Sequence, residues 1–277
     1  FSGHTGAVRG ALVLDDGSIL SWSSDNTLRR WVPDGDVLMT FSGHADEVLG
    51  MVALKDGSLL SRSSDKTLRR WARDGATLAT FSGQTRYVYG ALALDDGTIL
   101  SWSQDGTLQR WARDGAVLAT FSGHTDSVNG VLALYDGSIL SWSDDETLRR
   151  WARDGTLMAT FSGHTRGVHG AVVFADGTIL SWSSASIGED DQLRRWSPDG
   201  STLATFSGHT RQIYGALLLN NSSILSWSPD GTLGYWKHDG TLLATFSGHT
   251  SAVLGALVLD DETILSWSDD GVLRRWS

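Results

Sequence analysis

Residues 1–40 read FSGHTGAVRGALVLDDGSILSWSSDNTLRRWVPDGDVLMT, and the rest of the chain repeats this stretch. The opening triplet Phe-Ser-Gly returns after steps of 40, 40, 40, 40, 45 and 40 residues, at Phe41, Phe81, Phe121, Phe161, Phe206 and Phe246. A fixed period in this range indicates one supersecondary unit repeated in series. We expect residues 1–277 to form a single domain of seven repeat units, which begin at residues 1, 41, 81, 121, 161, 206 and 246.

Each unit carries the pattern of four short strands joined by tight turns. In the first unit, Asp16-Gly17, Ser24–Thr27 and Pro33–Gly35 have the composition of turns. They separate four stretches that read as strands: Ala7–Leu14, Ser18–Ser23, Leu28–Trp31 and Val37–Ser42. No segment shows the 3.6-residue apolar period of a helix. An antiparallel sheet that is apolar on both faces must pack against copies of itself, so the sequence predicts an all-β, seven-bladed β-propeller of four-stranded antiparallel blades.

The composition limits the cellular compartments and the classes of binding partner that we expect. The chain has 22 Lys and Arg against 32 Asp and Glu, a net charge of −10, which disfavours binding to a nucleic-acid backbone. It has no cysteine, which excludes disulfides and is compatible with a reducing cytosol. No signal-peptide pattern opens the chain, and no apolar run approaches the roughly 18 residues of a membrane span. We expect a cytoplasmic protein that binds neither nucleic acid nor membranes.

Three single residues recur at fixed places in the units. A His preceded by Gly stands before the first strand in six units: His4, His44, His124, His164, His209 and His249. An Asp stands in the turn before the third strand in all seven: Asp25, Asp65, Asp105, Asp145, Asp190, Asp230 and Asp270. A Trp follows that Asp after six residues: Trp31, Trp71, Trp111, Trp151, Trp196, Trp236 and Trp276. In these marks the whole chain resembles the WD-repeat β-propellers.

The resemblance implies a structural role for these residues. In that family the His, a Ser of the second strand, the turn Asp and the Trp form a hydrogen-bonded tetrad, and Ser21 or Ser23 would supply the hydroxyl here. The third unit has Gln84 in place of the His, which predicts a weaker tetrad. The resemblance also implies a ring closed between the N- and C-terminal strands, since the chain begins within a fourth strand and stops after a third.

The chain departs from the family pattern in two ways. The Trp-Asp pair that names the family is absent, because Trp31 and its counterparts are followed by Val, Ala, Ser or Lys. Trp22 and its five counterparts stand where the family has a small residue, and the second unit has Arg62 there. A cation–π pair between Trp22 and Arg30 is one interpretation, but the second unit keeps Arg70 without the Trp.

The closeness of the copies resembles that of the highly repetitive bacterial propellers. Those propellers are often the C-terminal sensor part of a larger signalling protein. The resemblance therefore implies an effector domain upstream in the same parent chain.

The residues with chemical potential favour a structural role over catalysis. Every unit except the third contains Ser, His and Asp, but catalysis needs a single site with an oxyanion hole, whereas a structural set explains the recurrence. The six Gly-His residues fall one to a blade, too far apart to share a metal ion. No phosphate-binding loop occurs. We expect no enzyme activity, no metal and no cofactor.

The positions that differ between units indicate where a ligand would bind. They are the residues on either side of Val8 and the residue before the turn Asp, with their counterparts. In the family these positions rim the mouth of the central channel, and the one insertion, five extra residues within Ser184–Glu189, falls in the same turn. The candidate ligand-binding residues are Arg9, Glu47, Tyr87, Tyr89, Asn129, Asp144, His169 and Tyr214. Neutral drift is the alternative, because Lys55, Tyr135 and their counterparts on the opposite rim vary as widely.

Three functions remain open on the sequence. The first is a non-enzymatic recognition module that binds a protein or peptide on the channel-mouth face, with Glu47 and Asp144 favouring cationic groups. The second is a recently amplified or engineered scaffold without an evolved ligand. The third is a glycan-binding lectin, against which the differences between blades count, because a lectin would repeat equivalent pockets.

Overall fold

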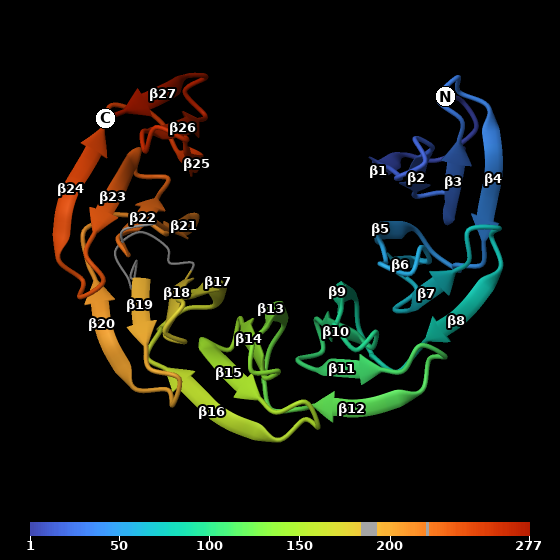
Figure 1. Ribbon diagram of the computed structural model, residues 1–277, viewed down its shortest axis with the longest axis horizontal. Coiled ribbons are helices and arrows are strands. Elements are labelled where there is room, and N and C mark those ends of the chain that lie inside the picture. Colours follow the sequence, from blue (N-terminus) through green and yellow to red (C-terminus); the bar gives the residue numbers. More distant parts are fainter. Residues whose placement is uncertain (184–192, 220–221) are drawn as a thin grey trace. The chain divides into compact units, whose positions relative to one another are not determined.

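The computed structural model describes residues 1–183, 193–219 and 222–277, which contain strands and no helix (Figure 1). Among these residues no helix has the length and apolarity that crossing a membrane requires. Asp190, together with the insertion predicted within Ser184–Glu189, lies outside the described residues. Every sheet is an antiparallel meander, in which each strand pairs with the next one along the chain. The prediction of an all-β fold built from seven sheets is confirmed.

The first of two compact units, Phe1–Gly123, holds three four-stranded sheets. The first sheet consists of β1 (Val8–Val13), β2 (Ile19–Ser23), β3 (Thr27–Trp31) and β4 (Val37–Ser42). The second consists of β5 (Val48–Ala53), β6 (Leu59–Ser63), β7 (Leu68–Trp71) and β8 (Thr77–Phe81). The third consists of β9 (Val88–Ala93), β10 (Ile99–Ser103), β11 (Leu108–Trp111) and β12 (Val117–Phe121).

The second compact unit, His124–Ser277, holds four sheets. The first consists of β13 (Val128–Ala133), β14 (Ile139–Ser143), β15 (Thr147–Trp151) and β16 (Leu157–Ser162). The second consists of β17 (Val168–Val173), β18 (Ile179–Ser183), β19 (Leu193–Trp196) and β20 (Thr202–Phe206). The last two are β21 (Gly215–Leu218), β22 (Ile224–Trp227), β23 (Thr232–Trp236), β24 (Leu242–Ser247), and β25 (Val253–Val258), β26 (Ile264–Ser268), β27 (Leu273–Trp276). The last sheet has three strands, so closure of the ring between the terminal strands stays a prediction, as does the single domain over 1–277.

The turns have the backbone geometry that their residues favour. Gly17 and Gly35 adopt φ values of +78° and +102°, a region in which a side chain would be strained. Asn26 takes φ +69° in the turn between β2 and β3, where Asn tolerates this geometry better than most residues. The local sequence therefore fixes the position of each turn and the ends of the strands that flank it.

Consecutive sheets within each compact unit pack against each other through a shared apolar layer. Between the first and second sheets, Leu20 and Leu28 of one pack with Val48, Leu59 and Trp71 of the next, all with 2 % exposure or less. The Phe that opens a repeat contacts the Trp of the same repeat across two neighbouring sheets, as Phe41 of β4 does edge to face with Trp71 of β7 at 5.8 Å. Burial of apolar side chains between neighbouring sheets is the main stabilising term of such a fold, because a single blade cannot exclude water alone.

Candidate functional site

A directed chain of hydrogen bonds links the recurrent residues of the first repeat. The indole Nε1–H of Trp31 donates to Ser21 Oγ at 2.8 Å, and Ser21 Oγ lies 2.8 Å from His4 Nε2. His4 Nδ1 lies 2.8 Å from Asp25 Oδ2. Since the indole can only donate and the carboxylate can only accept, the chain runs from Trp through Ser and His to Asp. The same three contacts occur in the repeats of His44, His124, His209 and His249.

The structure selects Ser21 of the two serines that the sequence left open. The other one, Ser23, is fully buried and its Oγ accepts the backbone N–H of Asp25 at 3.0 Å. Asp25 in turn accepts from the backbone N–H and the hydroxyl of Thr27. The second serine therefore holds the turn, while the first links the Trp to the His.

The third repeat differs from this arrangement, and the fifth is described only in part. In the third, Gln84 Oε1 accepts from Ser101 at 3.0 Å, and its amide donates to the carbonyl of Thr107 rather than to Asp105. In the fifth, His164 Nε2 lies 2.7 Å from Ser181 Oγ, which also accepts from Trp196. Its turn residue, Asp190, lies outside the described residues.

The environment of the turn Asp favours its charged form. Partial burial raises the pKa of Asp65, but hydrogen bonds from His44 and Thr67 outweigh burial and hold the pKa well below its usual range. Asp25, Asp145 and Asp230 have pKa values lowered in the same way, and the pKa of Asp270 falls to about 2. A carboxylate with this environment stabilises the fold as an acceptor and is a poor general base at neutral pH.

Burial separates this Ser-His-Asp arrangement from a hydrolase triad. Ser61, Ser141 and Ser226 have no exposed surface, and each hydroxyl already accepts an indole N–H. A nucleophile must be able to reach its substrate, and these buried hydroxyls cannot. The four residues therefore serve to hold the loop before the first strand against the sheet. Among the described residues, no three His, Asp or Glu side chains gather as a metal site would need.

Trp22 and its five counterparts each cover a glycine on the neighbouring strand. Gly10 pairs with Trp22, and a Cβ at Gly10 would lie 2.3 Å from the indole. Arg30 does not stack on this ring. Its guanidinium instead donates to Ser18 and Asp16 and to the carbonyl of Arg73 in the next repeat.

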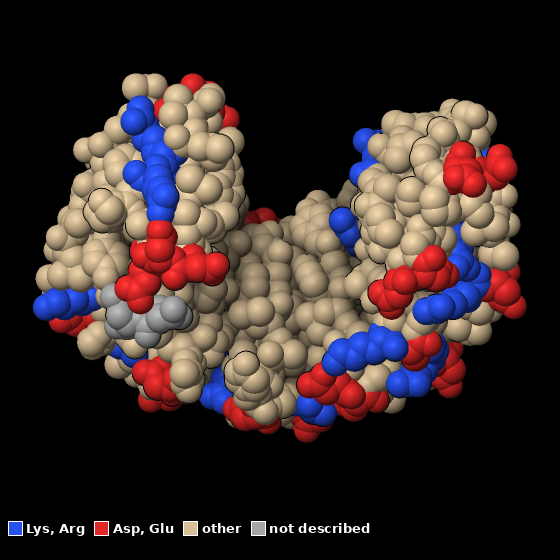
Figure 2. Space-filling view, turned by 45° about the horizontal axis from the view of Figure 1, so that its top comes forward, with Lys and Arg blue, Asp and Glu red and all other residues tan. Residues whose placement is uncertain are grey.

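These Arg–Asp pairs recur along the chain. Their members are Arg30–Asp16, Arg70–Asp56, Arg110–Asp96, Arg150–Asp136, Arg195–Asp176 and Arg275–Asp261. Figure 2 shows several basic side chains beside acidic ones on the surface that it displays. The charges of these Arg residues are thus neutralised locally.

The three variable positions lie together at one end of the first four sheets and of the last one. The backbone N–H of Gln104, before the turn Asp, donates to the carbonyl of Tyr87, and Ser24, Ser64, Asp144 and Asp269 donate to Ala7, Glu47, Ser127 and Ala252 in the same way. The position after the Val is the extra residue of a β-bulge, because the register shifts between Val8 and Gly10 and at the corresponding place in the sheets of Leu49, Tyr89, Asn129, His169 and Leu254. A bulge redirects a side chain away from the regular alternation of the strand.

The eight candidate residues form two groups, one in each compact unit. We call Arg9, Glu47, Tyr87 and Tyr89 the Tyr87 face, and Asn129, Asp144, His169 and Tyr214 the Tyr214 face. The three Tyr rings are 39–47 % exposed, whereas Val88, between Tyr87 and Tyr89, is buried. Four of the candidates form two pairs that interact with each other, one an ion pair and the other a hydrogen bond. Arg9 donates two hydrogen bonds to Glu47, at 3.0 and 2.6 Å, and Asn129 donates to Asp144 at 2.6 Å.

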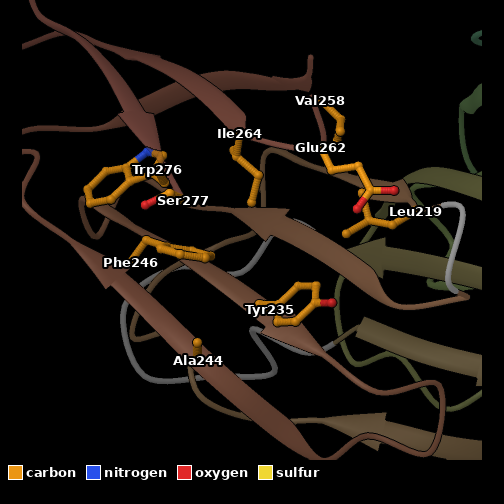
Figure 3. A pocket seen from close by; sticks show the side chains of 9 residues that line it. All are labelled: Leu219, Tyr235, Ala244, Phe246, Val258, Glu262, Ile264, Trp276 and Ser277. Atoms are coloured by element: carbon orange, nitrogen blue, oxygen red, sulfur yellow. The ribbon is translucent and has the colours of Figure 1, made fainter. Parts of the chain in front are cut away.

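An apolar cavity of about 400 Å³ lies in the second compact unit, away from the candidate residues (Figure 3). Tyr235, Phe246, Ile264 and Trp276 are among its lining residues, and it contains none of the candidates. In other repeats the corresponding space is taken by the turn that follows the Trp, since a Cβ at Gly115 would lie 2.8 Å from the carbonyl of Thr80. The cavity therefore marks the edge of β27 rather than a ligand site.

Similarity to known proteins agrees with this geometry. The model of the family "WD domain, G-beta repeat" matches residues 35–72, 115–152 and 240–277, each window ending one residue past the recurrent Trp. Three stretches of the chain are thus similar to WD40 repeats. The crystal structure of the WD40 beta propeller domain of Doa1 is similar over 100 % of this chain and 94 % of that chain, with a TM-score of 0.60 and 25 % identity. No curated protein matches significantly.

The resemblance to WD-repeat β-propellers is thus confirmed, and it indicates a general class of function. WD40 propellers are typically protein-interaction scaffolds and generally non-catalytic. The positions that vary between the repeats could be read from the sequence, and their role in ligand binding stays a prediction. The bulge at Tyr89 and the Arg9–Glu47 pair were missed, since both depend on how separate strands and repeats align.

Proposed function

We propose that the protein is a recognition module that binds a peptide segment of another protein on the Tyr87 face. The observation that carries this proposal is the sequence Tyr87-Val88-Tyr89, in which a buried Val anchors two half-exposed Tyr rings. Exposed Tyr residues on a rigid support are typical of interface hot spots, because they offer large contact area at a small cost in side-chain entropy.

The structure changes the expected charge preference of this face. Glu47 was expected to favour cationic groups, but Arg9 of the preceding repeat neutralises it. Asp144, on the Tyr214 face, is occupied in part by the amide of Asn129. We therefore base the proposal on the aromatic pair and not on an acidic rim. A sensor role within a larger cytoplasmic protein remains part of the proposal, supported by the similarity to repetitive propellers.

The proposal is tested by selecting displayed random 12-residue peptides on the immobilised full chain. Peptides bound by the wild type should lose about tenfold or more of their affinity on the double variant Tyr87→Ala/Tyr89→Ala, the size of loss expected when hot-spot aromatics are truncated. Tyr135→Ala is the matched control, because Tyr135 is fully exposed and lies in the turn between β13 and β14. Peptides that bind all three proteins equally would contradict the assignment of this face.

A further inference from the structure

The second repeat differs from the other six at the residue that covers the glycine of its first strand. Six repeats have Trp at this position, and the second has Arg62, which pairs with Gly50. A Cβ at Gly50 would lie 2.8 Å from Arg62 Nε, so the base of the guanidinium lies over the glycine as an indole does elsewhere. The narrower side chain of Arg62 replaces only part of the volume of the indole.

A cavity of about 200 Å³ lies at this place, between the second and third sheets of the first compact unit. Arg62 forms a polar wall, Trp102 of the next repeat forms an aromatic wall, and Leu60 and Leu68 are apolar neighbours. Sites for whole small molecules usually measure about 300–1,000 Å³. This cavity therefore suits a single side chain better than a complete small-molecule ligand.

The guanidinium of Arg62 lacks a carboxylate among the described residues. Among those residues its hydrogen bond is a long one, from one terminal nitrogen to the carbonyl of Val88 at 3.4 Å. The Arg residues of the third strands differ, since Arg70 in the same repeat binds Asp56 at 2.6 Å. Burial lowers the pKa of Arg62, the direction expected for a cation held away from water without an acidic partner.

The position of Arg62 connects the cavity to the Tyr87 face. Val88, whose carbonyl accepts from Arg62, is the residue between the two exposed Tyr rings. Because Arg9 and Glu47 cancel each other, Arg62 supplies an uncompensated positive charge beside this face. A planar guanidinium donates two parallel hydrogen bonds to a carboxylate, a geometry that an ammonium cannot reproduce.

From these observations we propose that Arg62 and its cavity bind the carboxylate side chain of an Asp or Glu in the peptide held on the Tyr87 face. This inference rests on the proposed function and names the class of partner, an acidic peptide. The apolar walls and Trp102 would receive the methylene groups, while the guanidinium would pair with the carboxylate. Pairing in a partly buried site also removes the cost of leaving Arg62 without a counterion.

The experiment compares one peptide in two forms on three proteins. The probe is the tightest-binding selected peptide, fluorescein-labelled, and its counterpart with each Asp or Glu changed to Asn or Gln. On the wild type the acidic form should bind at least tenfold more tightly than the amide form. On Arg62→Trp, which restores the residue of the other six repeats, this difference should vanish. Arg62→Lys should keep only part of it, because it keeps the charge and loses the planar fork.

The outcomes separate the inference from the proposed function. Equal binding of both peptide forms to the wild type, or a difference that persists in Arg62→Trp, would overturn the carboxylate site. The proposed function would still stand in that case if the peptides need Tyr87 and Tyr89 for binding. A selection without peptides that depend on these two Tyr residues would overturn both. Weak displacement of the peptide by millimolar glutarate from the wild type but not from Arg62→Trp supports the site. Glutarate binding more tightly than the peptide would overturn the assignment to a peptide.

Discussion

Trp102 of β10 lies across from Gly90 of β9, so closely that a Cβ at Gly90 would come within 2.1 Å of the indole. The same relation joins Gly10 to Trp22 and Gly130 to Trp142. An aromatic side chain that covers a cross-strand glycine compensates the strand for the missing side chain. Each of these glycines is thus required by the ring opposite it.

Gly90→Ala should therefore destabilise the protein by about 1–3 kcal/mol, the usual cost of forcing extra atoms into a packed site. The measurement is the free energy of unfolding in urea. Gly50→Ala is the matched control and should cost less, because a Cβ there meets the side chain of Arg62, which can move. Equal losses in the two variants would contradict the role of the indole.

Restoring the missing His of the third repeat should stabilise it. Gln84 does not bond to Asp105, whereas His44 and His124 bond to the Asp of their own repeats at 2.8 Å. Gln84→His should raise the free energy of unfolding by about 1–2 kcal/mol, as expected for a hydrogen bond to a charged group. The converse change, His124→Gln, should lower it by a similar amount. If His124→Gln proves neutral by thermal melting, the tetrad contributes no net stability.

Acid should weaken the fold through the turn carboxylates. The pKa values of Asp25, Asp65, Asp145 and Asp230 lie below that of an unfolded Asp, about 3.9. Groups of this kind bind protons more readily when unfolded, so their stabilisation is present above about pH 4 and is lost as the pH falls through the folded values. Urea midpoints should stay level from pH 7 to 5 and drop steadily from pH 4 to 2.

The variant Asp65→Asn isolates one of these carboxylates. It should be less stable than the wild type at pH 7, because it weakens the contacts with His44 and Thr67. It should also lose less stability on acidification, since one proton-linked group is gone. A parallel pair of curves for wild type and variant between pH 5 and 2 would show that Asp65 does not contribute to the acid dependence.

The predicted closure of the ring has a specific form in the register of the other sheets. Thr27 pairs with Ser42, Thr147 with Ser162, and Thr232 with Ser247, so closure would pair Val272 with Ser2. Because the chain has no cysteine, Ser2→Cys/Val272→Cys should form a single disulfide on mild oxidation, visible as a shift in non-reducing electrophoresis. Thr147→Cys/Ser162→Cys is the positive control. A free pair of thiols in the first variant, with a disulfide in the control, would argue against closure.

The strands of the first repeat were predictable almost to the residue. Ala7–Leu14, Ser18–Ser23 and Leu28–Trp31 were expected, and β1, β2 and β3 span Val8–Val13, Ile19–Ser23 and Thr27–Trp31. The fourth strand, Val37–Ser42, has the expected bounds. Turn residues act locally, so their effect on the backbone can be inferred without knowing the rest of the fold.

The sequence alone determined the repeat, its four strands and the set of residues that recur, because these follow from local backbone preferences and from comparison among the copies. Tertiary structure decided the rest: which of Ser21 and Ser23 contacts the Trp, and that Arg9 is paired with Glu47. It also placed Arg62 beside the carbonyl of Val88 in the next repeat, with no carboxylate partner in the described part of the chain. Each of these contacts joins residues from different strands or repeats. Their partners depend on register and on the packing of one sheet against another, and a linear pattern does not specify either.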